Sequence, residues 1–155
     1  MGSAVSSPPQ VPHLRLAASL FGQQLDPLRE REWLVTNGLG GYAAGTLGGP
    51  ATRRYHGLLV AAAPPPNARW VMVAGAQVQA TVGDECSWLS THEYLDGTIH
   101  PDGYRHLAGF ELIGSRPTWT WKVAGQTLRA DLWMPYGANQ TVLRYHNDGE
   151  APVEL

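Results

Sequence analysis

The stretch "TWTWKVAGQTLRADLW", residues 118–133, decides the fold class of this 155-residue chain. Apolar and polar side chains alternate up to Val123, and the alternation resumes after a two-residue turn at 124–125. A period of two is typical of a strand with one buried face, and two such runs across a short turn predict an antiparallel hairpin. Arg129 and Asp131 are expected on the face opposite the aliphatic side chains.

Further short strands are expected on both sides of this hairpin, because 18 glycines and 12 prolines divide the chain into short segments. The expected strands lie within residues 31–36, 54–62, 70–90 and 141–147. The third of these segments is long enough for two or three strands, with a turn at 83–84. Antiparallel strands at this spacing predict an all-β fold, a β-sandwich.

The two ends of the chain differ from this strand-rich middle. Ser, Pro and Gly dominate the first residues, so residues 1–20 are expected to form a disordered or partly helical tail. The one helix predicted, of two or three turns, covers residues 13–22. Residues 21–155 are expected to form one sandwich domain. Because residues 153–155 resemble the start of another strand, the chain is expected to be an incomplete N-terminal portion of that domain.

Composition and charge restrict the partners and the compartment. The formal net charge is -2, and a chain without a basic field is a poor partner for nucleic acid. No apolar run approaches the roughly 18 residues that cross a bilayer, and the N-terminus lacks the blocks of a signal peptide. Cys86 is the only cysteine, so no internal disulfide can form. These features predict a cytoplasmic protein without nucleic-acid or membrane partners.

The glycine-rich segment "TNGLGGYAAGTLGGPATRRYHGLLVAA", residues 36–62, raises the possibility of a nucleotide loop. Residues 38–43 match G-x-G-x-x-A, but a dinucleotide fold needs a helix to begin there, and the glycines and proline at 45–50 prevent one. The acidic residue expected about 20 residues further on is also missing. No nucleotide cofactor is therefore expected, and Gly38, Gly40 and Gly41 are predicted to form an irregular loop.

Metal and catalytic chemistry have few candidates. The segment "THEYLDGTIHPDGYRH", residues 91–106, is rich in possible ligands, but its spacings match no zinc pattern, so no metal site is expected. Asp96, Asp102 and Glu111 are glycosidase carboxylates by residue type alone, and nothing in the sequence pairs them. The nucleophile motif G-x-S-x-G is absent. No catalytic residue and no cofactor are assigned to the chain.

Two long motifs make the chain resemble a known family, the N-terminal domain of the bacterial and archaeal type of glycogen debranching enzyme (amylo-α-1,6-glucosidase). That family carries a "REWLVTNGLGGYASGT" segment followed by "TRRYHGLL". This chain has closely similar stretches at residues 31–46 and 52–59. Later segments at 100–110, 117–123 and 134–146 are also similar in order and spacing. One departure is Gln77, which stands near a position where the family tends to carry an acidic residue.

The resemblance implies a large β-sandwich of the supersandwich type, placed before a catalytic (α/α)6 barrel in the same polypeptide. The barrel of such an enzyme supplies the carboxylates that hydrolyse α-1,6-glucosidic branch points in glycogen and related α-glucans. This chain is then expected to be a non-catalytic module that braces the barrel and helps to shape the glucan site. The alternatives are a stand-alone carbohydrate-binding module and an interaction domain with no role in sugar binding.

Five residues of the two long motifs are the candidates for contact with the substrate or the barrel: Asn37, Arg53, Arg54, Tyr55 and His56. Arginine offers five donors, which suit sugar hydroxyls and the carbonyl groups of an irregular loop equally well. If a strand began at Arg53, side chains would alternate between faces. Arg53 and Tyr55 would then lie on one face, and Arg54 and His56 on the other.

Overall fold

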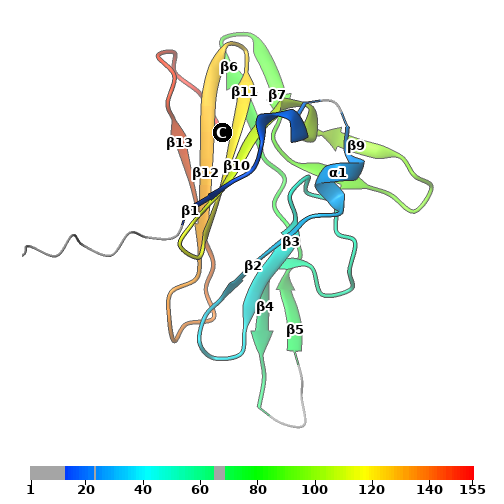
Figure 1. Ribbon diagram of the computed structural model, residues 1–155, viewed down its shortest axis with the longest axis vertical. Helices are drawn as coiled ribbons and strands as arrows, with labels where there is room; N and C mark the ends of the chain where they lie inside the picture. Colours follow the sequence, from blue (N-terminus) through cyan, green and yellow to red (C-terminus); the bar gives the residue numbers. More distant parts are fainter. Residues whose placement is uncertain (1–12, 23, 65–68) are drawn as a thin grey trace, which may run out of the picture.

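The computed structural model describes residues 13–22, 24–64 and 69–155, and its elements are almost all antiparallel strands. Two larger sheets and two small hairpins make up the molecule (Figure 1). The five-stranded sheet has the order β1-β10-β11-β12-β13. Its strands span, in chain order, His13–Arg15, Leu107–Ile113, Arg116–Val123, Gln126–Trp133 and Val142–Asn147. The predicted all-β sandwich is thus confirmed.

The second sheet has four strands in simple chain order, β2-β3-β4-β5. These strands span Glu32–Thr36, Tyr42–Thr46, Gly57–Ala62 and Arg69–Val73. One small hairpin joins β6 (Gln79–Val82) to β7 (Glu85–Trp88), with the predicted turn at 83–84. The other hairpin joins β8 (Thr91–Glu93) to β9 (Ile99–Asp102).

Among the residues that the structure describes, helical structure is limited to three short turns. The α-helix α1 spans Asp26–Arg29, and the 3-10 turns η1 and η2 span Ala18–Leu20 and Gly103–His106. No helix in the described residues is long and apolar enough to cross a membrane. The scarcity of helix agrees with the many glycines and prolines, which interrupt a helix but suit turns between strands.

The hairpin of β11 and β12 forms as its alternation predicts. Val123 pairs with Gln126, and the two turn residues Ala124 and Gly125 have φ values of 46° and 75°. Positive φ at both central positions is typical of a type I′ turn, whose twist matches that of the flanking strands. The turn therefore sets the register in which the aliphatic residues of both strands face the core.

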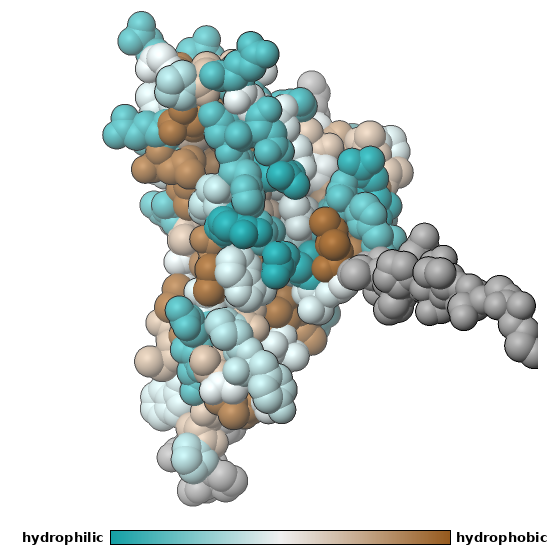
Figure 2. Space-filling view, turned by 90° about the vertical axis from the view of Figure 1, so that its left-hand side faces the viewer, coloured by the Kyte–Doolittle hydropathy of each residue, from teal (hydrophilic) through white to brown (hydrophobic). Residues whose placement is uncertain are grey.

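The outer face of this hairpin carries a buried carboxylate. Asp131 accepts hydrogen bonds from Arg144 at 3.1 Å and from His146 at 2.9 Å, and Arg116 lies 3.6 Å away. Burial raises the pKa of Asp131, but these hydrogen bonds and arginine charges outweigh it, so the net pKa lies below its usual value. Hydrophilic residues cover much of the middle of this face (Figure 2). The cluster joins β11, β12 and β13 on the side away from the core.

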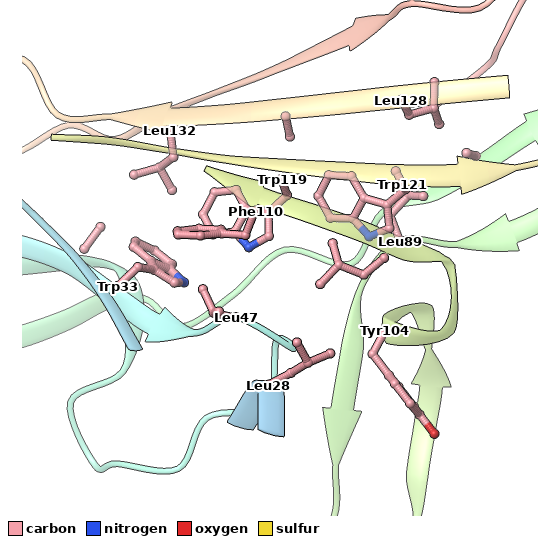
Figure 3. Close-up of a cluster of buried hydrophobic side chains, with 14 of the residues drawn as sticks. Leu28, Trp33, Leu47, Leu89, Tyr104, Phe110, Trp119, Trp121, Leu128 and Leu132 are labelled. Atoms are coloured by element: carbon pink, nitrogen blue, oxygen red, sulfur yellow. The ribbon is translucent and has the colours of Figure 1, made fainter. Parts of the chain in front are cut away.

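The core lies where the two sheets face each other (Figure 3). Trp33 of β2 meets Trp119 of β11 edge to face, with ring centroids 5.2 Å apart and an interplanar angle of 84°. Phe110 of β10 packs on the same tryptophan at 5.5 Å. Such T-shaped aromatic pairs add to the free energy gained by burying apolar area. Trp119 therefore packs against an aromatic ring of each sheet.

Two expectations about local structure were wrong. Residues 13–22 do not form a helix: residues 13–15 are strand β1, which pairs with the edge of β10, and Ala18–Leu20 is a single 3-10 turn. Backbone pairing along β10 outweighs the weak helix propensity of this segment. The tail predicted for residues 1–20 lies largely outside the described residues. The glycine-rich segment is also less irregular than expected, because it contains the whole of β3.

Candidate functional site

The turn between β2 and β3 is built around the side chain of Asn37, which is fully buried. Its Oδ1 accepts hydrogen bonds from the backbone N–H groups of Leu39 at 2.9 Å and Gly41 at 3.0 Å. Its Nδ2 donates to the carbonyl of Ala138 at 3.0 Å and to Oδ1 of Asn139 at 2.9 Å. These four bonds tie the glycine turn to the segment before β13 and use the full hydrogen-bonding capacity of the amide.

Glycine is required at several places in this turn. Gly38 and Gly40 have φ values of 78° and 87°, which other residues rarely adopt. A Cβ atom at Gly38 would lie 2.3 Å from the ring of Tyr136, and one at Gly41 would lie 2.8 Å from Nδ2 of Asn37. The segment from 38 to 41 is thus a tight turn between two strands. The strand that follows it leaves no helix N-terminus for a phosphate group.

The predicted strand from Arg53 was wrong, because β4 begins only at Gly57. Residues 53–56 form a turn in which the N–H of His56 donates to the carbonyl of Arg53 at 3.1 Å. Nδ1 of His56 accepts a further hydrogen bond from the N–H of Thr52 at 3.2 Å. The expected alternation of faces therefore does not apply. Arg53, Arg54 and Tyr55 are all exposed, and His56 alone is buried.

Glu32, on strand β2, holds this turn in place. Its carboxylate accepts a hydrogen bond from Nε of Arg53, and Nε2 of His56 lies 3.4 Å from the same oxygen. The hydrogen bond from Arg53 is the main cause that lowers the pKa of Glu32 below its usual value. Arg53 and His56 therefore interact with one carboxylate, and Arg54 and Tyr55 project between them at the tip of the turn.

Arginine and tyrosine side chains continue from this turn across the outer face of the four-stranded sheet. The Arg54 guanidinium lies 5.5 Å from the ring centroid of Tyr55, which is 41% exposed. The hydroxyl of Tyr42 donates to the carbonyl of Tyr55 at 3.3 Å, and Arg69 lies over the Tyr42 ring at 5.9 Å. We call this region the Arg–Tyr surface. It comprises Tyr42, Arg53, Arg54, Tyr55 and Arg69.

A cavity of about 260 Å³ lies on the other side of the same sheet, between it and the five-stranded sheet. Its lining is mainly apolar and includes Trp33, Trp119 and Leu132. Nε2 of His92, another lining residue, is buried and has no hydrogen-bond partner within the described part of the chain. His56 lies between the two regions, because it lines this cavity and also approaches Glu32.

The carboxylates considered from the sequence are each engaged locally. Asp96 accepts from the N–H of Thr98 at 2.9 Å within its own turn, and Asp102 pairs with Arg105 at 2.8 Å. Glu111 pairs with His13 and Arg15 of β1. Within the described ranges, no three His, Cys, Asp or Glu side chains lie close enough together to hold a metal ion. The geometry thus offers a surface and a cavity, and it assigns no acid–base pair.

Sequence signals could have identified part of this arrangement. Asn37-Gly38 after a strand is a strong hairpin signal, and it predicts a turn at the site where Asn37 acts. Tyr42 and Arg69 were not among the candidate residues, because only the folded sheet brings them beside the 53–56 turn. Nothing in the sequence links either of them to the turn.

Comparison with known proteins identifies the family. Residues 31–155 match the family model described as glycogen debranching enzyme N terminal. Searches of curated proteins and of solved structures found no match to the chain. The matched region contains both sheets apart from the short edge strand β1, together with all of the Arg–Tyr surface. Since the match covers most of its length, the chain belongs to the glycogen debranching enzyme N-terminal family.

Proposed function

We propose that this N-terminal module of a glycogen debranching enzyme uses its Arg–Tyr surface to brace the catalytic domain and to help shape the glucan site. The enzyme would hydrolyse α-1,6-glucosidic branch points in glycogen or related α-glucans. The single observation that carries the proposal is the exposed but tightly held turn at residues 53–56, within the stretch that most resembles the family.

The geometry of this turn favours a contact over a purely internal role. Arg53 and His56 are anchored by Glu32, so the turn keeps its shape without help from Arg54 or Tyr55. Those two side chains are exposed and stacked against each other. A preorganised arginine loses less conformational entropy on binding than a free one, so such a residue suits an interface.

The same groups suit a glucan. A tyrosine ring can cover the apolar C–H face of a sugar, and a guanidinium can donate to its hydroxyls. Tyr55 and Arg54 offer this combination side by side, and Tyr42 and Arg69 repeat it next to them. The proposed partners are therefore the catalytic barrel of the same polypeptide and, at its entrance, an α-glucan.

Arg54→Ala in the full-length enzyme tests this function. Loss of its donors is expected to lower kcat/KM for branch hydrolysis about tenfold, which corresponds to about 1.4 kcal/mol of transition-state stabilisation. The control is Arg129→Ala, since Arg129 is another arginine with a partly exposed side chain, but it pairs with Asp148 and lies on the outer face of the other sheet.

The measurement combines steady-state kinetics on a branched α-glucan with a thermal unfolding curve for each variant. The control is expected to keep kcat/KM within about twofold of the parent, because Arg129 belongs to the five-stranded sheet and the proposed site to the four-stranded one. Equal kinetics for Arg54→Ala and the parent at equal stability would reject the proposed role. A loss of glucan affinity with an unchanged kcat would favour a carbohydrate-binding module.

A further inference from the structure

Strand β5 is exposed to an unusual degree for a strand with apolar side chains. All five of its residues are exposed, and they include Trp70 at 60% and Met72 at 63%. Val71 and Val73 are 39% and 42% exposed. A run of four large apolar residues open to solvent marks an interaction site or an aggregation hazard.

The backbone of β5 is open as well. It pairs with β4 on one side, and among the described residues it is the last strand of its sheet (Figure 1). Natural sheets usually protect such an edge with charges, prolines or bulges. Here Arg69 is the only charged residue of the strand, and it turns to the carbonyl of Gly40 at 3.2 Å. The free edge can therefore accept another strand.

The cavity between the sheets lies beside the C-terminal end of β5. Residues 74–76, which follow β5 directly, line it and are themselves exposed, and Gly57 beside Val73 lines it too. The hydroxyls of Ser90 and Thr91 are already used by backbone N–H groups. Nε2 of His92 is the polar atom left buried without a partner among the described residues. An occupant of this cavity needs apolar side chains and one hydrogen-bonding group for His92.

We propose that a β-strand from the rest of the debranching-enzyme chain pairs with the free edge of β5 and inserts apolar side chains into the cavity. A strand pairs through its backbone and points alternate side chains to one face, so one segment can satisfy the edge and the cavity together. A second copy of β5 would cover the edge and leave the cavity open. The proposal rests on the family assignment, and it concerns the backbone edge of β5, which shares only Arg69 with the Arg–Tyr surface.

Thiol labelling in the full-length enzyme tests the proposal. Met72→Cys and Leu14→Cys are compared in a Cys86→Ser background, because Cys86 is exposed and free. Leu14 is the matched control: it is 53% exposed, and it lies in the middle of β1, an edge strand of the other sheet. Alkylation rates are read for each peptide by mass spectrometry. The thiol at position 72 is expected to react at least about tenfold more slowly than the thiol at position 14, because the reagent can reach it only when the covering strand opens locally.

Three results would overturn the proposal. The two thiols would react at equal rates if β5 stayed open. Protection that disappears on dilution to a monomer would mean that a second copy covers the edge. In the unsubstituted enzyme, where no variant has to fold, deuterium uptake in the 69–73 peptide as fast as in the 13–15 peptide would also contradict it. Because Arg54→Ala is read by kinetics and this contact by protection, either proposal can fail while the other stands.

Discussion

Replacing Trp119 with alanine is expected to lower the free energy of unfolding by about 4 kcal/mol, the largest effect of any substitution considered. Trp119 is only 8% exposed and lies between Trp33 of the opposite sheet and Phe110 of its own sheet. Truncation removes both edge-to-face contacts and leaves a void beside an existing cavity. Neighbouring side chains cannot easily fill the combined space, so the full cost of the void is expected.

Urea denaturation of the parent and variant measures this effect, and Trp119→Phe is the matched control. Phenylalanine keeps an aromatic ring at the sheet interface, so about half of the loss is expected. A double-mutant cycle with Trp33 should give a coupling of about 1 kcal/mol, as for aromatic pairs. A Trp119→Ala loss below about 1 kcal/mol would show that the two sheets do not pack through this residue.

Asn37→Ala is expected to cost about 3 kcal/mol, although it removes only a short polar side chain. The N–H groups of Leu39 and Gly41 would lose their acceptor, and the carbonyl of Ala138 would lose its donor. The costly part is the loss of partners for buried polar groups, since Asn37 is fully buried and its bond from the N–H of Gly41 is buried too. The glycine turn and the segment before β13 would lose their link.

Two further variants separate the halves of the Asn37 network in the same denaturation assay. Asn139→Ala removes one of the four bonds and is expected to cost about 1 kcal/mol. Asn37→Asp keeps an acceptor for the two N–H groups but loses both donors, so an intermediate loss is expected. If Asn37→Ala lowered the free energy of unfolding no more than Asn139→Ala does, the four hydrogen bonds of the buried amide would not be what stabilises the turn.

The sequence predicts well those parts of the fold in which neighbouring side chains differ strongly in polarity. Around Trp119 the contrast between tryptophan and threonine marks every second residue, and the turn at 124–125 follows directly. In β3, by contrast, Ala43, Ala44 and Gly45 are all small. Such residues give no periodic signal, so the strand was hidden in what looked like a loop.

The candidate site depends more on tertiary contacts, and sequence reasoning reached less of it. The 53–56 segment contains strand-forming residues, but the hydrogen bonds of His56 close it into a turn. Residues 13–15, for which a helix was expected, form a strand because they pair with β10. Asn37 was selected as a possible ligand contact, but the structure shows its polar atoms bound within the protein. For residues 13–15 and for Asn37 the outcome depends on partners far away in the sequence, β10 and Ala138, which local patterns do not encode.

We propose that the Arg–Tyr surface contacts the catalytic part of a debranching enzyme. Peptide-resolved hydrogen exchange of the full-length enzyme tests it most directly, with the peptide covering residues 52–57 followed before and after addition of a branched α-glucan. A covered turn predicts slow exchange before any glucan is present, and a further decrease once glucan occupies the site. Exchange at the rate of a solvent-exposed turn under both conditions would contradict the claim.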